Sequence, residues 1–237
     1  MEKSHFSKLV DNGFNHIPVS RKLLVDTDTA LALYLKLANG PYSYFLESVQ
    51  GGEKWSRYSF IGLCAQTVIK VFDYQVTLEK EGDIVETHQV KDPLSWIEEY
   101  QAQFRVPKMD NLPVFNGGLV GYFGYEIIRY IEPKLAHLDK PDELNVPDIL
   151  LMLSNDLLVV DNLSSTAHII THVNPQEGSY EDAIVRLDAI EAQIKEPLIE
   201  SASEPANIKA EDFVSSFGRE NFMRSVRSEE RRVGKEC

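Results

Sequence analysis

Residues 147–173 read PDILLMLSNDLLVVDNLSSTAHIITHV, and this stretch decides the fold. Its runs of leucine, isoleucine and valine are typical of β-strands. The polar cluster from Asn162 to Ser165 interrupts these runs and indicates a turn. We therefore expect two or three strands here, joined by a turn at Asn162–Ser165.

More strands are predicted upstream of this stretch. They are expected at residues 42–49, 57–63 and 66–80. The sequence EGD, Glu81 to Asp83, is expected to turn the chain back toward a further extended run at residues 84–90. The segment 117–132 is rich in glycine and aromatic residues, and it predicts a strand that runs into a short helix from Tyr125 to Ile131.

Residues 26–40 predict a helix. Thr27 or Asp28 can cap its start, and Gly40 stops it. The residues expected to line its apolar face are Leu31, Tyr34, Leu35 and Ala38.

Two further helices carry clear start signals. Asp92 is a helix cap followed by Pro93, which suits the first helical turn. Ser179 and Asp182 have the spacing of a capping box. Because strands and helices mix without strict βαβ alternation, the sequence predicts an α+β fold with a largely antiparallel β-sheet flanked by helices.

Composition excludes some classes of function. The chain has 237 residues and a formal net charge of −13, which argues against nucleic acid or an anionic membrane as the main partner. It has no apolar run near the roughly 20 residues that cross a bilayer, and its start shows no signal-peptide core. We expect a cytoplasmic protein in which Cys64 is a small buried hydrophobic residue.

The standard metal-binding and phosphate-binding motifs are missing. His168 and His172 are four residues apart, but a strand would place them two pleats apart, so we expect a solvated strand face rather than a metal site. Four glycines at positions 117, 118, 121 and 124 do not follow the dinucleotide-binding fingerprint. Glycines inside a strand usually mark close backbone packing, which we expect here.

The hairpin FLESVQGGEKWSRYSFIG, residues 45–62, holds the most informative polar pattern. Glu47 and Ser48 lie on its first strand, and Arg57 and Ser59 lie on the returning strand. A carboxylate and hydroxyls beside cationic groups suit a zwitterionic small ligand. The alternative is a surface hairpin whose charges pair across strands, and the pattern alone favours it. Since Glu47 and Ser48 face opposite sides of a regular strand, a shared pocket requires a bulge, a backbone contact or a role in ordering the strand.

Three motifs resemble one enzyme family. Residues 42–62 resemble the opening motif of anthranilate synthase component I, the chorismate-using subunit of tryptophan biosynthesis. Residues 117–132 and 146–163 are similar to two further motifs of the same N-terminal region, and the spacing between the motifs fits. The resemblance covers nearly everything from about Asn15 to Val226. Aminodeoxychorismate synthase component I, of folate synthesis, has a similar layout but resembles the first motif less closely.

The resemblance implies a fold and a regulatory site. The fold would be the N-terminal part of the chorismate-utilising-enzyme sandwich. Glu47 and Ser48 match the family's Leu-Glu-Ser element, which binds tryptophan as a feedback inhibitor, and Ser48 is the foremost tryptophan-binding candidate. Arg57 and Ser59 are expected near the same pocket.

The family's chemistry lies in a C-terminal domain. The resemblance implies that the complete enzyme, a lyase, converts chorismate to anthranilate and pyruvate. It would use Mg²⁺ and take ammonia from a glutamine amidotransferase subunit, component II. No catalytic or metal role is carried over to this chain, which we expect to be inactive alone. The alternatives are aminodeoxychorismate synthase component I and a stand-alone amino-acid-binding regulatory module.

Four segments are expected along the chain. Residues 1–195 would form the N-terminal domain, 196–212 a polar linker, and 213–226 the start of a truncated C-terminal chorismate-binding domain. Residues 227–237, RSEERRVGKEC, depart from the family and match the translation of a common sequencing-adapter sequence. We therefore expect this last segment to be an adapter-derived artefact.

Overall fold

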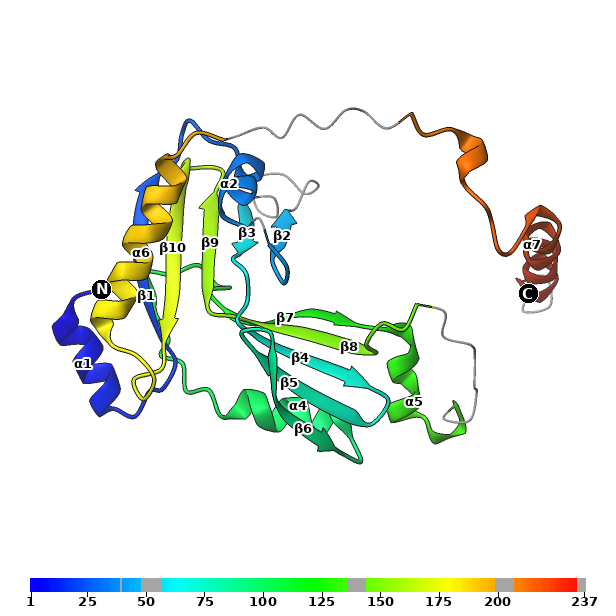
Figure 1. Cartoon of the computed structure of the whole chain (residues 1–237), viewed down its shortest axis with the longest axis horizontal. Helices are drawn as coiled ribbons and strands as arrows, with labels where there is room; N and C mark the ends of the chain where they lie inside the picture. The colour runs from blue at the N-terminus through cyan, green and yellow to red at the C-terminus, as the bar shows by residue number, and fades with distance from the viewer. Residues whose placement is uncertain (39, 48–56, 136–143, 199–206, 234–237) are drawn as a thin grey trace. The chain divides into compact units, whose positions relative to one another are not determined.

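Two compact units make up the chain (Figure 1). The computed structural model describes residues 1–237 with the exception of 39, 48–56, 136–143, 199–206 and 234–237. The first unit spans Met1–Leu198, and the second spans Ile199–Cys237. All the described strands belong to the first unit.

The first unit contains two antiparallel sheets of five strands each. The first sheet has the strand order β1-β10-β9-β3-β2, in which every neighbouring pair is antiparallel. Its strands are β1 (Ile17–Leu24), β10 (Thr166–Val173), β9 (Asp156–Asp161), β3 (Tyr58–Gly62) and β2 (Tyr44–Glu47).

The second sheet has the order β6-β5-β4-β8-β7, again antiparallel throughout. Its strands are β6 (Asp83–Gln89), β5 (Gln75–Lys80), β4 (Thr67–Phe72), β8 (Ile149–Ser154) and β7 (Gly118–Phe123). The predicted turn at Glu81–Asp83 is confirmed, since it separates β5 from β6. The predicted α+β class is also confirmed, although two sheets form rather than one.

The stretch 147–173 links the two sheets. It forms β8 of the second sheet and then β9 and β10 of the first, and only Asn155 separates β8 from β9. Figure 1 shows β8 and β9 running in crossing directions on either side of this residue. The predicted turn at Asn162–Ser165 is confirmed between β9 and β10, and Ser165 has a positive φ of 50°.

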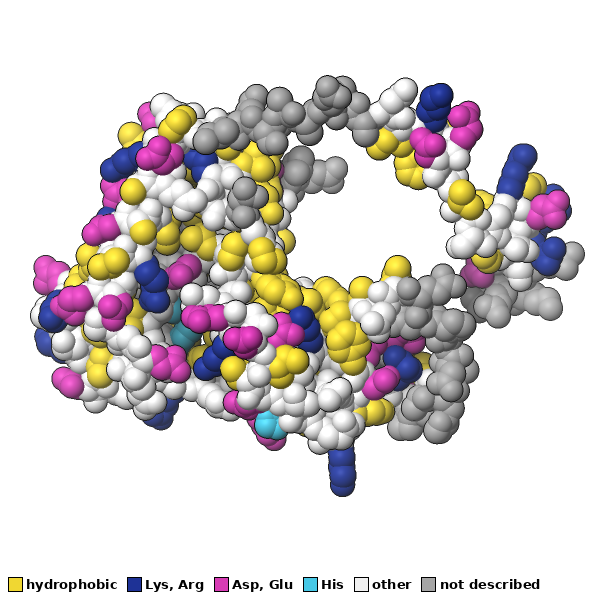
Figure 2. Space-filling view, viewed as in Figure 1, with side chains coloured by type: hydrophobic (Ala, Val, Ile, Leu, Met, Phe, Trp, Pro, Cys, Tyr) yellow, Lys and Arg dark blue, Asp and Glu magenta, His cyan; other side chains and the backbone are white. Residues whose placement is uncertain are grey.

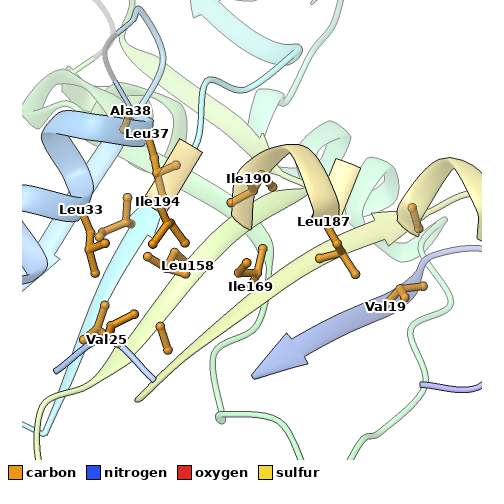
Figure 3. Packing of buried hydrophobic residues seen from close by; sticks show 14 of the residues in the cluster. Val19, Val25, Leu33, Leu37, Ala38, Leu158, Ile169, Leu187, Ile190 and Ile194 are labelled. Atoms are coloured by element: carbon orange, nitrogen blue, oxygen red, sulfur yellow. The ribbon is translucent and has the colours of Figure 1, made fainter. Parts of the chain in front are cut away.

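Two helices, α6 (Tyr180–Lys195) and α2 (Ala30–Leu37), cover one face of the first sheet. Figure 3 shows the packing, in which Leu158 and Ile169 of the sheet lie beneath both helices. The helix residues in this core are Ala183, Leu187, Ile190 and Ile194 of α6 and Ala30, Leu33 and Leu37 of α2. Helix α1 (Lys3–Asp11) adds Phe6 and Leu9 to the same cluster. Burial of this apolar surface is the main stabilising term for the first sheet.

Helix α4 (Pro93–Ala102) belongs to the second sheet. Its Ile97 packs against buried residues of β4, β5 and β8, which are Ile69, Val71, Val76, Leu78, Ile149 and Leu151. The Asp92 carboxylate accepts a hydrogen bond of 3.0 Å from the backbone N–H of Leu94. The predicted cap, followed by proline at the first turn, is therefore confirmed.

The two sheets meet through aromatic residues. Phe60 of β3 and Phe115, which precedes β7, pack edge to face with ring centroids 5.3 Å apart. Both residues contact buried positions of the second sheet as well as of the first. Figure 2 shows hydrophobic side chains gathered on the side of the first unit where the sheets approach each other. This aromatic contact fixes the position of the β2–β3 hairpin relative to the second sheet.

The predicted start of α2 was wrong, and its predicted apolar face was right only in part. Thr29 caps the helix, because its side chain accepts a hydrogen bond of 3.1 Å from the backbone N–H of Ala32. Of the predicted face, Ala38 is buried and Tyr34 packs against the core, whereas Leu31 and Leu35 are exposed. The core also takes Ala30, Leu33 and Leu37. Helix α2 is apolar on nearly every side. Contact with α6, rather than the spacing of apolar residues in the sequence, therefore determines which face is buried.

Other helix predictions are confirmed. Ser179 and Asp182 form the predicted capping box of α6, with the Ser179 side chain accepting from the Asp182 backbone N–H at 3.2 Å. The predicted short helix after β7 appears as the 3₁₀ turn η1 (Tyr125–Ile127) and α5 (Ile128–Ile131). A second 3₁₀ turn, η2 (Pro133–Leu135), follows it.

The close backbone packing predicted for the glycines is confirmed at Gly121 but not at Gly118, where an added Cβ would have no atom within 4 Å. A Cβ atom at Gly121 would lie 1.9 Å from the backbone oxygen of Leu150 in the paired strand β8. The prediction for Cys64 was wrong, because this residue is exposed. It lies in the connection between β3 and β4, beyond the end of the paired region of β3.

The second unit contains the 3₁₀ turn η3 (Ala210–Asp212) and helix α7 (Arg219–Val233). No helix in the described ranges combines the length and apolar character that spanning a membrane requires. The proposed segment boundaries at 195, 212 and 226 remain predictions.

Candidate functional site

The β2–β3 hairpin brings two of the predicted site residues into direct contact. Glu47, the last residue of β2, lies opposite Ser59 of β3 in the antiparallel register. The Ser59 hydroxyl donates a hydrogen bond of 3.2 Å to Oε1 of Glu47. Ser59 is 0% exposed, whereas Glu47 reaches the surface. A buried hydroxyl therefore orients a carboxylate that lies at the surface.

Asn162 completes this polar chain. Its side-chain amide donates a hydrogen bond of 3.0 Å to the Ser59 hydroxyl, and its backbone N–H donates to the carbonyl of Arg57 at 2.8 Å. Asn162 thus holds Ser59 in the rotamer that reaches Glu47. The sequence marked Asn162 only as a turn residue, because its link to Ser59 depends on the pairing of β3 with β9.

Arg57 is occupied by a different partner. Its Nε and Nη2 atoms donate to the two carboxylate oxygens of Asp161, at 3.0 Å and 2.6 Å. The Arg57 guanidinium is the largest cause that lowers the pKa of Asp161 to about 2, and the backbone N–H of Leu163 adds to the effect. This bidentate pair secures the turn after β9. The Arg57 charge is therefore already neutralised beside the hairpin.

Ser48, the foremost predicted residue, lies outside the described residues, as do Gly51, Gly52 and Lys54. Strand β2 pairs regularly with β3 up to Glu47, where it ends. The predicted conflict over the facing of Glu47 and Ser48 therefore stays untested. So does the assignment of Glu47, Ser48, Arg57 and Ser59 to a ligand pocket.

The predicted solvated face at His168 and His172 was wrong. His172 is only 4% exposed, and its ring stacks on the ring of His16 with centroids 4.4 Å apart. His168 is partly buried. Burial is the largest cause that lowers the pKa of both His168 and His172. The physical reason is that the His16 ring covers the ring of His172, and Phe104 packs in turn against His16.

Magnesium was predicted for the complete enzyme only. Within the described ranges, no group of three or more His, Cys, Asp or Glu side chains is placed to hold a metal ion. These residues do not fit a magnesium site, so no chemical step is derived through the metal here.

Comparisons with known proteins relate this geometry to a family. Residues 43–234 match the family described as chorismate binding enzyme. The chain is 44% identical over 230 residues to "Anthranilate synthase component 1" of Pseudomonas aeruginosa, a match that covers 95% of this chain and 47% of the relative. It is also 44% identical over 232 residues to the protein of the same name from Neisseria meningitidis serogroup B, covering 95% of this chain and 46% of the relative.

One solved structure is similar in outline. It is the crystal structure of anthranilate synthase component I from Streptococcus pneumoniae, with a TM-score of 0.49 and 22% sequence identity. The match covers 74% of this chain and 37% of that one. This chain spans about half the length of the curated relatives it matches.

Proposed function

The chain belongs to the chorismate-binding enzymes, and on this premise we propose that it is the N-terminal, tryptophan-binding part of an anthranilate synthase component I. The observation that carries the proposal is the 44% identity over 230 residues to a protein of that name. The β2–β3 hairpin supports the regulatory role, because it holds a carboxylate in a fixed and accessible position.

The complete protein would convert chorismate to anthranilate and pyruvate, the first step of tryptophan biosynthesis. Ammonia would come from glutamine through an amidotransferase subunit, component II, and Mg²⁺ would be needed. We place the catalytic and metal residues of this lyase outside the present chain. The chain alone is accordingly proposed to be inactive and cytoplasmic.

The tryptophan site would use the hairpin in a defined way. Glu47 would accept the ammonium group of tryptophan, since a carboxylate held by Ser59 is a preorganised acceptor. Ser48 would contact the ligand directly. Arg57 would act through Asp161 by fixing the turn beside Ser59, because its guanidinium is bound bidentately there.

The reaction is tested by expressing the complete reading frame with a component II subunit. Chorismate and glutamine are supplied with Mg²⁺, and the products are identified by fluorescence and mass spectrometry. Anthranilate and pyruvate are the expected products. Formation of aminodeoxychorismate without anthranilate would replace the proposal with the folate-pathway enzyme. Anthranilate formation by residues 1–226 alone would contradict the proposed inactivity.

Tryptophan regulation is tested by inhibition of that complete enzyme. L-Tryptophan is expected to inhibit it, and Ser48→Ala and Glu47→Gln are expected to raise the inhibitory concentration by about tenfold. Ser7→Ala, at an exposed position of α1, is the matched control and leaves inhibition unchanged. Equal inhibition of all variants would remove the hairpin from the tryptophan site. If no reaction occurs but the chain binds tryptophan, a stand-alone regulatory module becomes the better description.

A further inference from the structure

The turn between β9 and β10 contacts the β2–β3 hairpin across strand β3. It spans residues 162–165 and follows directly after Asp161, the last residue of β9. Strand β3 lies between β2 and β9 in the first sheet, and Tyr58 at the start of β3 is paired with Asp161. The turn is therefore separated by one strand from Glu47 on β2, and it reaches Glu47 through the side chains of β3.

Two hydrogen bonds attach Asn162, the first residue of this turn, to the returning strand of the hairpin. Its backbone N–H donates to the carbonyl of Arg57 at 2.8 Å, and its side-chain amide donates to the hydroxyl of Ser59 at 3.0 Å. The first bond forms with any residue that has a backbone N–H at position 162. The second bond needs the amide group. A substitution at Asn162 can therefore remove the side-chain bond and keep the backbone bond.

The turn has support of its own, which does not involve the Asn162 amide. The Asp161 carboxylate binds Arg57 through two hydrogen bonds of 3.0 Å and 2.6 Å. Its Oδ1 atom also accepts from the backbone N–H of Leu163 at 3.1 Å. Because Arg57 lowers the pKa of Asp161 to about 2, the carboxylate is ionised at neutral pH and keeps both contacts. The Asn162 side chain is thus free to serve Ser59.

Ser59 connects Asn162 to Glu47. A serine hydroxyl has one proton to donate and lone pairs to accept with. Ser59 donates its proton to Oε1 of Glu47 at 3.2 Å and accepts from the Asn162 amide at 3.0 Å. The two bonds together fix both the rotamer and the proton direction of this hydroxyl. Since Ser59 is 0% exposed, its effect on a ligand at the surface passes through Glu47.

The direction of these bonds determines what Glu47 offers to a ligand. Ser59 donates to Oε1, and a carboxylate accepts at both of its oxygens, so Oε2 can accept from a ligand N–H. Glu47 lies at the surface, at the end of β2. A carboxylate that is already oriented loses less conformational freedom when it binds an ammonium group. The strength of that contact therefore depends on the bonds behind Glu47.

We propose that Asn162 is a positioning residue of the tryptophan site, whose amide orients Ser59 and, through Ser59, the Glu47 carboxylate. This role rests on the function proposed above, because it requires that tryptophan place its ammonium group on Glu47. Asn162 and Ser59 do not touch the ligand. They set the affinity of Glu47 for the ammonium group, and hence the tryptophan concentration that inhibits the complete enzyme.

The test is tryptophan inhibition of the complete enzyme, assembled with component II, in the variant Asn162→Ala. This change deletes the amide and keeps the backbone N–H that binds Arg57. We expect the inhibitory concentration to rise by about threefold to tenfold. Leu163→Ala is the matched control, because Leu163 is the next residue of the same turn and its side chain is 63% exposed. It should leave the inhibitory concentration unchanged.

A double-mutant cycle with Glu47→Ala distinguishes positioning from general damage to the hairpin. If Asn162 acts through the Glu47 carboxylate, its effect disappears when that carboxylate is absent. Asn162→Ala should therefore change the inhibitory concentration by less than about twofold in the Glu47→Ala background. A merely structural role would produce the same factor in both backgrounds.

Ser59→Ala provides a second variant, because it removes the hydroxyl that joins Asn162 to Glu47. It should raise the inhibitory concentration at least as much as Asn162→Ala does. Combining the two changes should have no larger effect than Ser59→Ala alone. The rate without tryptophan, measured for each variant, reports whether the enzyme is folded. If Asn162→Ala has lost that rate, the cycle of Ser59→Ala with Glu47→Ala decides.

The results separate the positioning role from the function on which it rests. If Glu47→Ala weakens inhibition and Asn162→Ala does not, the tryptophan site stands and the role of Asn162 is overturned. Equal factors for Asn162→Ala with and without the Glu47 carboxylate also overturn it. Absence of tryptophan inhibition in the wild type would instead overturn the proposed regulation, and the positioning role would fall with it.

Discussion

Gly121 illustrates how a single residue permits the pairing of two strands. Any side chain at this position would begin 1.9 Å from the backbone oxygen of Leu150, and a backbone atom cannot move aside as a flexible side chain can. We therefore expect Gly121→Ala to lower the free energy of unfolding by about 3 kcal/mol or more. Urea denaturation measures the change. Gly178→Ala is the control, because its Cβ would make only ordinary contacts at 3.8 Å, and a similar loss in both variants would refute the explanation.

His16 predicts how stability depends on pH. Its pKa is lowered to about 3 in the folded chain by burial and by His172, against an ordinary value of 6.5. As the pH falls, the unfolded chain therefore binds a proton at His16 at a higher pH than the folded chain does. The contribution of His16 to the free energy of unfolding is complete above pH 6.5 and is lost progressively as the pH falls toward 3. Between pH 7 and pH 5, this residue alone should cost about 2 kcal/mol of unfolding free energy.

The measurement for His16 is urea denaturation at pH 7 and pH 5. His16→Phe keeps the ring and removes the titration, so its loss of stability between the two pH values should be smaller by about 2 kcal/mol. His168 and His172 also have lowered pKa values and retain their share of the loss. An unchanged pH dependence in His16→Phe would show that His16 is not buried in its neutral form.

At the scale of single residues, the sequence predicted which residue types line the hairpin better than it predicted their spatial partners and their burial. The residue types of Glu47 and Ser59 and their places on the two strands were readable, and the structure shows that they meet across the hairpin. Asn162 and Asp161 were not recognised as partners, because they approach the hairpin through the pairing of β3 with β9. The burial of His172 was missed for the same reason, since its cover comes from His16 at the far end of the chain.

At the scale of elements, local signals predicted helix starts wherever one capping residue stood alone. Asp92 and Ser179 were identified correctly. The start of α2 was misplaced because three capping candidates, Thr27, Asp28 and Thr29, stand close together. Only the position of Ala30 in the core decides among them.

Helix α6 allows a direct test of its buried face. Leu187 is 1% exposed and packs in the core of the first sheet, whereas Val185 on the same helix is 66% exposed. We expect Leu187→Ala to lower the unfolding free energy by about 2–5 kcal/mol, through lost burial and the cavity that remains. Val185→Ala should change it by less than about 0.5 kcal/mol. Chemical denaturation of both variants measures the difference, and comparable losses would show that α6 packs on another face.

At the scale of the whole molecule, the pattern gave the fold class but not the arrangement of strands. Alternation and turns predicted an α+β chain with antiparallel pairing, and both features are present. The division into two sheets could not be predicted, because β1 pairs with β10 and β3 pairs with β9 across long sequence separations. The chain passes from the first sheet to the second between β3 and β4 and returns at Asn155, and nothing in the sequence context of Asn155 distinguishes it from a strand residue.

The core clusters make a prediction about the second unit. In the described ranges, no residue of these clusters lies beyond Ile194, although the chain continues to Cys237. Deleting residues 199–237 should therefore shift the melting temperature by less than about 3 °C, because every described residue of these core clusters remains. Ending the chain at Gly178 instead removes α6 and should abolish cooperative melting, since four residues of that helix are in the core. Calorimetry on both truncations provides the measurement, and a fall of about 10 °C on deleting 199–237 would show that the second unit stabilises the first.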